Sequence, residues 1–338
     1  MNWSHVTSSR RVRRGLRACV AACIALVVPA IVGVASASAV WVPRPGTTWQ
    51  WDIIENVPEP FLPVQMYDVD LEQAVPSETR IPVTLGGRTT VVTWRAGQNA
   101  GIVDRLHRAG KIAICYLDTG AYETYRPDAA LFPGTPGWRR GDPSSDVILN
   151  DTGWNDEYWL DIRPGQWQKF APIMWARLDL AKRIGCDGVE PDQNNPWRNV
   201  PDDFPLTLAH QKAWYLKVAE QAHLRDLSVG MKNAPEEEVT DADTVRAFDW
   251  NLNEECFVYE ECDTLEQFID AGKAVFNTEF TDVWVAERRT SRYADPLVLR
   301  RTVCALAARR DRYGRLTYLS RFSILIKTEV PDDPYYTC

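Results

Sequence analysis

Acidic, amide and lysine side chains recur directly after short apolar runs in this sequence. The stretch 187–192, DGVEPD, shows this most clearly, because it reads as a short buried strand that ends in two carboxylates. A charge at the end of a buried strand is costly unless it is paired, solvated or used. For any single residue, structural pairing and function explain the position equally well, but the set as a whole favours a site. Its members are Asp52, Asp68, Asp70, Asp118, Glu190, Asp192, Lys232, Asn233, Asn253, Glu254, Glu279 and Lys327.

The histidines and motifs of this chain narrow the chemistry. His5, His107, His210 and His223 lie near the amino terminus or in predicted helices, and neither G-x-S-x-G nor H-E-x-x-H occurs. A pair of carboxylates must then transfer protons, as in the hydrolysis of glycosidic bonds. Trp and Tyr in predicted loops could stack on sugar rings, although core packing is the alternative. These aromatic residues are Trp138, Trp154, Trp159, Trp197, Tyr122 and Tyr125.

Eight apolar runs alternate with amphipathic stretches, which is typical of repeated βα units. The predicted strands are 49–54, 64–69, 111–118, 186–192, 227–232, 248–253, 273–279 and 321–327. Eight strands in about 300 residues predict an α/β fold, a single-domain TIM (β/α)8 barrel with long βα loop insertions. A doubly wound open sheet is the alternative, but no G-x-G-x-x-G loop supports a nucleotide site.

Two connections are longer than a simple crossover requires. Residues 71–99 include a predicted hairpin about Gly86 and Gly87. Residues 119–159 are rich in Pro, Gly and Trp and follow the third predicted strand, on the side where a barrel carries its site loops. We therefore expect 119–159 to form a lid or a wall of the cleft.

Residues 1–39 resemble a secretory signal peptide, followed by the barrel domain at 40–338. Five arginines precede an apolar run at 18–34, which is short for a membrane span, and small residues follow up to Ala39. We expect export through the Sec or the twin-arginine route and a secreted, extracellular protein. Removal of the signal leaves 33 basic and 46 acidic residues, a net charge of −13.

This acidity disfavours nucleic acid and anionic membranes as partners and suits a cationic or amino-sugar polysaccharide. Solubility alone is an equally good explanation of the charge. We expect a monomer without stable membrane association after signal cleavage, and we expect no cofactor and no metal site.

Six cysteines follow the predicted signal, so an exported chain can form disulfides. Cys256 and Cys262 flank a short loop and form the most plausible pair, and Cys338 most plausibly bonds to Cys304. For Cys115 and Cys186, which lie in or beside predicted strands, free thiols and a disulfide are both consistent with the sequence.

A series of stretches resembles glycoside hydrolase family 114 and spans most of the chain in order. Among them are 114–123 (ICYLDTGAYE), 125–129 (YRPDA), 159–163 (WLDIR), 185–192 (GCDGVEPD), 227–233 (LSVGMKN), 248–257 (FDWNLNEECF) and 272–277 (GKAVFN). The resemblance implies a TIM-barrel endo-α-1,4-polygalactosaminidase. The loop after Asp192 and the hairpin near Gly86 depart from the family pattern.

By motif position, the resemblance places the two catalytic carboxylates at Asp192 and Glu254. Asp192 would be the nucleophile or stabilising carboxylate and Glu254 the general acid/base, with the order of roles left open. For substrate binding we expect Asp118, Tyr122, Glu123, Glu190, Lys232, Asn233, Asn253 and Glu279. The alternative function is a non-catalytic barrel that binds an amino sugar.

Overall fold

The computed structural model describes residues 40–135, 137, 146–202, 204–234, 239–328, 332 and 335–338. The predicted signal at 1–39 and Trp138 lie outside these residues. From residue 40 onward the described chain belongs to one unit. No helix in the described ranges has the length and apolar character needed to cross a bilayer.

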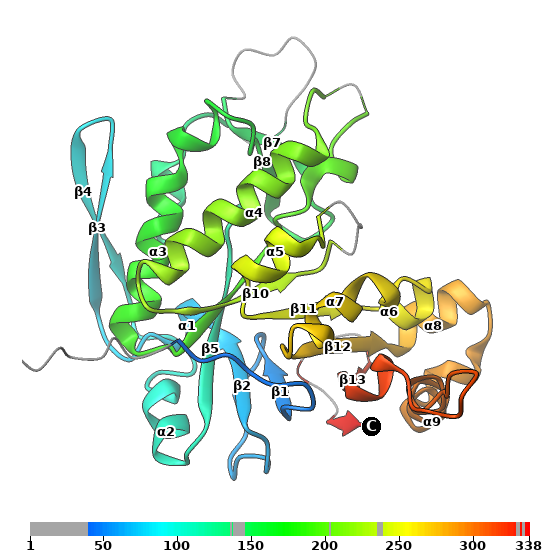
Figure 1. The fold of residues 1–338 in the computed structure, drawn as a ribbon. Helices are drawn as coiled ribbons and strands as arrows, with labels where there is room; N and C mark the ends of the chain where they lie inside the picture. Colours follow the sequence, from blue (N-terminus) through cyan, green and yellow to red (C-terminus); the bar gives the residue numbers. More distant parts are fainter. Residues whose placement is uncertain are drawn as a thin grey trace, which may run out of the picture. The chain divides into compact units, whose positions relative to one another are not determined.

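A curled sheet of parallel strands forms the centre of the fold (Figure 1). Its eight parallel strands, in sheet order, are β1 (Trp49–Asp52), β2 (Met66–Asp70), β5 (Ile112–Asp118), β9 (Gly188–Asp192), β10 (Ser228–Lys232), β11 (Trp250–Glu254), β12 (Val275–Phe280) and β13 (Ser323–Lys327). A short ninth strand, β14 (Tyr336–Thr337), pairs antiparallel with β13. Each parallel strand overlaps one of the eight predicted runs.

Strand β1 leads to β2 without a helix, and from β2 onward at least one helix separates each parallel strand from the next. The helices are α1 (Leu71–Ala74), α2 (Ile102–Arg108), α3 (Ala171–Ile184), α4 (Leu208–His223), α5 (Ala242–Ala247), α6 (Cys256–Tyr259), α7 (Glu266–Asp270), α8 (Thr281–Arg288) and α9 (Pro296–Ala307). Short 3-10 turns lie at Ala129–Leu131, Trp167–Lys169, Pro196–Arg198, Cys262–Leu265, Ser291–Ala294 and Tyr318–Arg321. Helix α4 begins with a capping box between Thr207 and His210, and α3 ends at Gly185 in the left-handed conformation.

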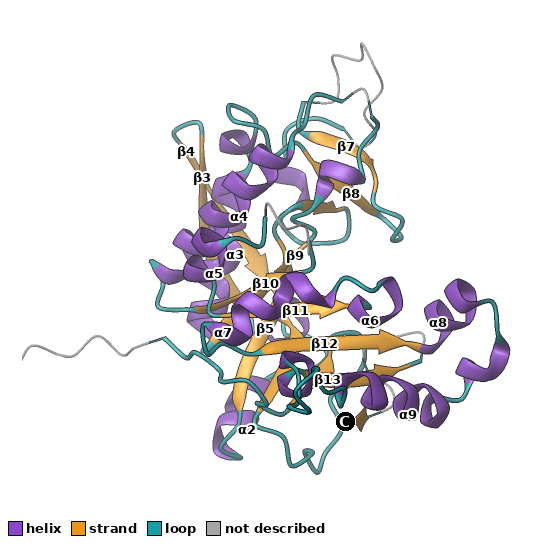
Figure 2. Ribbon diagram, turned by 45° about the vertical axis from the view of Figure 1, so that its right-hand side comes forward, coloured by secondary structure: helices purple, strands orange, loops and turns teal. Residues whose placement is uncertain are grey.

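Two smaller sheets lie in the long connections. The predicted hairpin is confirmed as β3 (Thr79–Leu85) and β4 (Arg88–Trp94), which pair antiparallel across Gly86 and Gly87 beside α3 (Figure 1). The 119–159 connection contains β6 (Ala121–Glu123), β7 (Ile148–Asp151) and β8 (Glu157–Leu160), an antiparallel sheet that the sequence did not predict (Figure 2).

Buried apolar side chains form two clusters that the strand period separates, because successive residues point to opposite faces. The buried residues of one cluster belong to the parallel strands, apart from Ala274 just before β12. In this cluster the ring centroids of Trp49 in β1 and Phe276 in β12 are 5.1 Å apart. The Trp49 indole also donates to the Ser323 carbonyl of β13 at 2.9 Å. The two ends of the strand order therefore approach each other.

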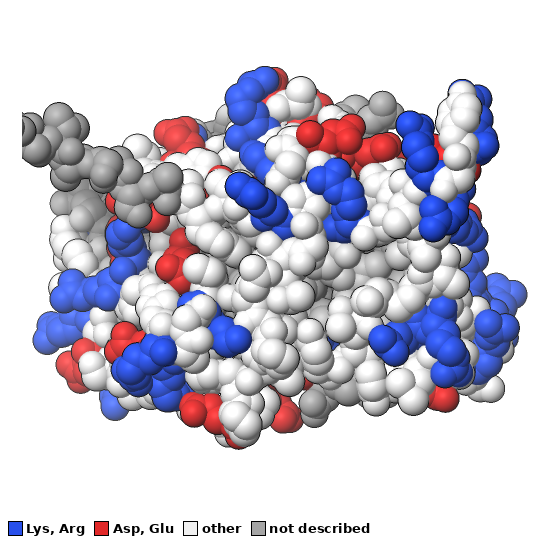
Figure 3. All heavy atoms as spheres, turned by 60° about the horizontal axis from the view of Figure 1, so that its bottom comes forward, with Lys and Arg blue, Asp and Glu red and all other residues white. Residues whose placement is uncertain are grey.

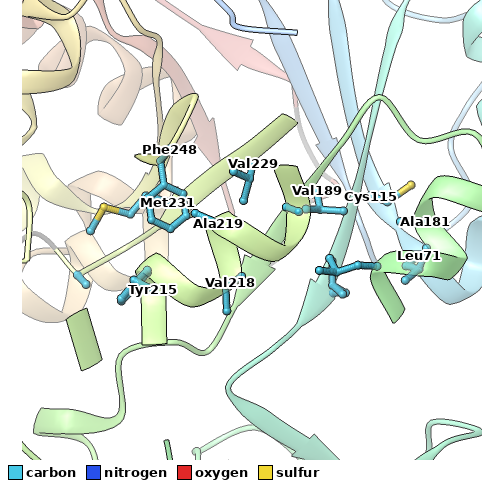
Figure 4. Packing of buried hydrophobic residues seen from close by; sticks show 14 of the residues in the cluster. Leu71, Cys115, Ala181, Val189, Tyr215, Val218, Ala219, Val229, Met231 and Phe248 are labelled. Atoms are coloured by element: carbon cyan, nitrogen blue, oxygen red, sulfur yellow. The ribbon is translucent and has the colours of Figure 1, made fainter. Parts of the chain in front are cut away.

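The other cluster lies between the sheet and the helices. Residues of α4 pack on β10 there, with Tyr215 and Phe248 ring centroids 5.9 Å apart and Met231 beside them (Figure 4). Burial of each large apolar side chain stabilises the fold by about 1.5–3 kcal/mol, so this layer holds the helices against the sheet.

Three disulfides connect the chain. Cys256–Cys262 and Cys304–Cys338 are the predicted pairs. Cys115 and Cys186, for which the sequence left thiols and a bridge open, form the third disulfide and join β5 to the residues just before β9.

Candidate active site

A cavity of about 750 Å³ lies at the carboxyl ends of the parallel strands. Asp192 at the end of β9, Lys232 at the end of β10 and Glu254 at the end of β11 all line it. Parallel strands end on one side of a sheet, so their terminal side chains converge although they are far apart in the sequence.

Lys232 lies between the two predicted catalytic carboxylates. Its ammonium nitrogen is 2.7 Å from an oxygen of Asp192 and 3.5 Å from an oxygen of Glu254, and the lysine side chain is only 2% exposed. The two carboxylate oxygens can thus be no farther apart than the sum of these distances, about 6 Å. Asp192 and Glu254 therefore face the same cavity as a pair.

Each carboxylate of the pair is also oriented by neighbouring amides. Asp192 accepts a hydrogen bond from the Gln193 backbone N–H at 2.6 Å. Glu254 accepts a hydrogen bond from the Asn233 side-chain NH2 at 2.8 Å. The Glu254 backbone N–H donates to the side-chain oxygen of Asn233 at 2.9 Å. Asn233, in the left-handed conformation just after β10, is thus fixed against the end of β11. Fixed partners preserve the geometry of the pair.

A buried carboxyl group, Glu190, supports Lys232 from inside the sheet. Glu190 accepts from the Lys232 ammonium at 2.8 Å and from the Trp51 indole at 3.0 Å. Burial raises the pKa of Glu190 to about 7, with Asp192 adding to the increase and Lys232 opposing it. Burial alone would lower the pKa of Lys232, but the charges of Asp192, Glu190 and Glu254 raise it well above its ordinary value. The lysine is therefore charged.

Described residues of the predicted wall at 119–159 form one side of the cavity. Tyr125, Trp154 and Trp159, three of the predicted sugar-stacking aromatics, line the cavity together with Arg126 and Glu157. The Arg126 guanidinium is held by Asp70 at 2.8 Å and by Glu123 at 2.6 Å. Trp197 does not line the cavity and packs against the core.

Glu255, which follows Glu254, also lines the cavity. Its backbone is left-handed, with φ of 70°, and is held by a 2.7 Å hydrogen bond from its N–H to the Thr278 carbonyl. Burial raises the pKa of Glu255 to about 8, and the negative charges of Glu254, Glu279 and Asp282 add to the shift. No separate signal in the sequence pointed to this residue, because it stands outside the strand.

Four of the ten predicted site residues line the cavity, namely Asp192, Glu254, Lys232 and Asn233. Asp118, Glu123 and Glu190 are fully buried and lie outside the described lining, and Tyr122 packs against Phe132 and Tyr158. Asp118 and Glu123 instead lie in a buried cluster of charged groups where the wall meets β5.

Asn253 and Glu279 also lie outside the lining, and the strand period explains why. Their neighbours Glu254 and Phe280 line the cavity, so the side chains one residue earlier point to the opposite face of the sheet. Glu279 accepts hydrogen bonds there from Asn277, the Phe257 backbone and Trp284. The prediction took Asn253 beside Glu254 and took Glu279 at the end of β12, where the side chain that faces the cavity is Phe280.

The lining of the cavity is acidic, whereas the face seen in Figure 3 is mixed in charge. That face carries basic and acidic side chains around a central uncharged area. The cavity lining contains seven carboxylates, Asp70, Glu72, Glu157, Asp192, Glu254, Glu255 and Asp282, against Arg126 and Lys232. Both cationic side chains are already paired with carboxylates, so the lining as a whole is acidic.

Comparison with known proteins places the chain in a family. Residues 32–338 match the model described as glycoside-hydrolase family GH114. Among solved structures, the chain is similar to Aspergillus fumigatus Ega3 in complex with galactosamine, with 26% identity and a TM-score of 0.65 over 89% of this chain and 99% of that one. No protein with curated function matches it.

Other solved structures are less similar to this chain, with TM-scores of about 0.4. An inactive double mutant of MutB in complex with isomaltulose shares 10% identity, with a TM-score of 0.41 over 78% of this chain and 58% of that one. A β-N-acetylhexosaminidase shares 11%, with a TM-score of 0.40 over 70% and 55%. The family match, in contrast, covers most of the sequence and includes both strand-end carboxylates. The chain belongs to glycoside-hydrolase family GH114 and is a glycoside hydrolase.

Proposed function

We propose that the protein is a secreted, endo-acting hydrolase of α-1,4-linked, galactosamine-containing polysaccharide. The observation that carries the proposal is the pair Asp192 and Glu254, held on one buried ammonium group at the edge of one cavity. Paired carboxylates cleave glycosidic bonds when one protonates the leaving oxygen and the other attacks the sugar carbon. The acidic lining suits a sugar that carries an ammonium group. The similarity to Ega3, crystallised with galactosamine, supports the same substrate class.

The roles of the two carboxylates follow from their surroundings. Asp192 lies closer than Glu254 to the Lys232 ammonium, and it accepts a hydrogen bond from the Gln193 backbone N–H. Both contacts stabilise a negative charge on Asp192. We assign Asp192 as the nucleophile and Glu254, whose side chain is 25% exposed, as the general acid/base. The oxygens of the two groups that contact Lys232 are at most about 6 Å apart, and this closeness favours retention of configuration, because retaining enzymes hold their carboxyl groups closer together than inverting ones. An NMR spectrum of the first-formed product would show the α-anomer, and a β-anomer would exclude this mechanism.

We also infer the setting in which this site works. Residues 1–39 act as an export signal, and 40–338 form a single TIM-barrel domain. The hydrogen bond from Trp49 to Ser323 supports closure of the sheet between β1 and β13. Three disulfides support an oxidising, extracellular location.

The purified protein should be incubated with partly deacetylated polygalactosamine and, in parallel, with other α-linked polymers, and the products read by mass spectrometry. We expect internal cleavage of the galactosamine polymer into a ladder of oligosaccharides. A binding barrel without catalysis would retain the polymer in a pull-down and yield no oligosaccharides, and cleavage of another polymer alone would refute the substrate assignment.

A further inference from the structure

Three carboxyl groups that the proposed reaction does not use converge where the wall meets β5. Asp118 ends β5, Glu123 ends β6 and Glu157 begins β8, and one oxygen of each lies within 4.8 Å of the others. Glu123 and Glu157 are directly opposite each other in the antiparallel ladder of β6 and β8. Like charges in that position destabilise a sheet unless something compensates them.

The two nearby guanidinium groups bind Glu123 and carboxylates outside the trio, but in the described structure neither forms an ion pair with the carboxyl group of Asp118 or Glu157. Arg126 contacts Asp70, Glu72 and Glu123, and Arg177 contacts Asp128 and Glu123. Four carboxylates thus share two cations. Within the described residues, no Lys or Arg side chain forms an ion pair with the carboxyl group of Asp118 or Glu157.

Both of these carboxyl groups have a buried oxygen without a partner. Asp118 is fully buried, and its Oδ1 accepts from the Tyr116 hydroxyl at 3.0 Å, but its Oδ2 has no hydrogen-bond partner in the described structure. Glu157 Oε1 lies 3.3 Å from the Tyr125 hydroxyl, and its Oε2 is also buried and without a partner there. Unsatisfied oxygens of this kind are costly, so their convergence points to a bound cation.

We propose that Asp118, Glu123 and Glu157 bind a divalent metal ion of the calcium type. Carboxylate oxygens without nitrogen or sulfur donors suit a hard cation, and Ca²⁺ accepts irregular sets of such ligands completed by water. Glu157 lines the cavity, whereas Asp118 and Glu123 do not. A small ion can therefore contact all three groups, while an ammonium group on a sugar ring reaches Glu157 only.

The position of this site suggests a structural role beside the catalytic pair. The ion would connect β5 to β6 and β8, and so fix the wall to the central sheet. Asp118 is also paired in register with Asp192 of β9. Binding of the ion would hold the wall at a constant distance from Asp192 without taking part in the reaction, and the inference does not depend on the proposed substrate.

Calorimetric titration of the chelator-treated protein with CaCl2, and in parallel with MgCl2, tests the site directly. We expect about one Ca²⁺ per chain, weaker binding of Mg²⁺, and an increase in Tm of about 5 °C at a Ca²⁺ concentration one hundred times the Kd. The variants Asp118→Asn and Glu157→Gln should lose this response. In chelator they should be at least as stable as the wild type, because each removes one like charge.

Two surface variants, Asp243→Asn and Glu260→Gln, match these substitutions at exposed ion pairs and should keep the Ca²⁺ response. If Asp118→Asn fails to fold, Glu157→Gln, at the cavity surface, provides the same comparison. If the wild type binds no Ca²⁺, the proposal is wrong, and bound protons would neutralise these carboxyl groups instead. An unchanged response in the folded variants would overturn the proposal as well.

Discussion

Lys232 is the residue on which the geometry of the proposed catalytic pair, Asp192 and Glu254, depends most. Its ammonium lies 2.8 Å from Glu190 and 2.7 Å from Asp192, in a side chain that is 2% exposed. Substitution Lys232→Met keeps the length of the side chain but leaves Glu190 buried without its cation. We expect a loss of about 3–5 kcal/mol in the free energy of unfolding, measured by urea denaturation, together with a loss of activity.

The matched control is Lys217→Met, which breaks an exposed ion pair with Glu220 whose side chains are 32% and 53% exposed. Such pairs contribute about 0–1 kcal/mol, so the control should denature at nearly the wild-type urea concentration. Equal losses in the two variants would show that Lys232 is not the support described here.

At the residue scale, the sequence predicted the two carboxylates that the structure places together on the cavity, Asp192 and Glu254, and only part of their surroundings. Asp192 and Glu254 were found because acidic residues at strand ends are unusual and matched a family motif. Asn253 and Glu279 also stand at strand ends, those of β11 and β12, but they face the other side of the sheet, and the sequence alone does not determine this register. Arg126 and Glu255 stand outside the parallel strands, so the strand-end rule did not reach them.

Among the elements, the turn after β5 controls the loop that follows Asp192. The backbone N–H groups of Thr119 and Gly120 point to the Asp192 carbonyl oxygen, at 3.1 and 3.3 Å. A Cβ atom on Gly120 would lie 1.8 Å from the Gln193 carbonyl oxygen, so Gly120→Ala must displace one of the two segments. We expect a loss of at least about 2 kcal/mol in stability and a lower kcat, measured by urea denaturation and product formation.

The hairpin turn provides the control for this variant. Gly86 has a positive φ of 54°, and no atom lies within 4 Å of the position that a Cβ atom would take there. Asn is well tolerated in such turns. Gly86→Asn should therefore keep both stability and activity. Wild-type activity in Gly120→Ala would contradict the contact between the two loops.

At the element scale, the parallel strands were easier to predict than the wall. The eight apolar runs in the sequence identified the eight parallel strands of the main sheet, because buried strands in such sheets are almost continuously hydrophobic. The strands β6, β7 and β8 have three or four residues each, and β6 pairs with β8 across a long segment. Pairing of short strands across such a distance depends on tertiary contacts and gives little local signal.

For the whole molecule, the disulfides should differ in their contribution to stability. Cys115–Cys186 closes 71 residues and Cys256–Cys262 closes 6. In the chain-entropy model these loops correspond to about 4 and about 2 kcal/mol, respectively. We expect the double substitution of Cys115 and Cys186 by Ala to lower the free energy of unfolding more than that of Cys256 and Cys262. A larger loss from the short loop, in urea denaturation, would contradict this order.

Stability should also fall as the pH rises from about 5 to 8. Burial raises the pKa of Glu190 and Glu279 to about 7 and that of Glu255 to about 8, from the ordinary value of 4.5. Between these values the unfolded chain has released protons that the folded chain retains, so rising pH favours unfolding. Urea denaturation across this range measures the slope, and Glu255→Gln should make it less steep. Stability that increased from pH 5 to 8 would contradict these shifts.

The central claim is that Asp192 and Glu254 act together on one glycosidic bond, and the rate of polygalactosamine cleavage by single variants tests it most directly. We predict that Asp192→Asn and Glu254→Gln each lose at least about a hundredfold in rate while remaining folded, and that the surface variant Glu260→Gln cleaves normally. Full activity in either Asp192→Asn or Glu254→Gln would contradict the account.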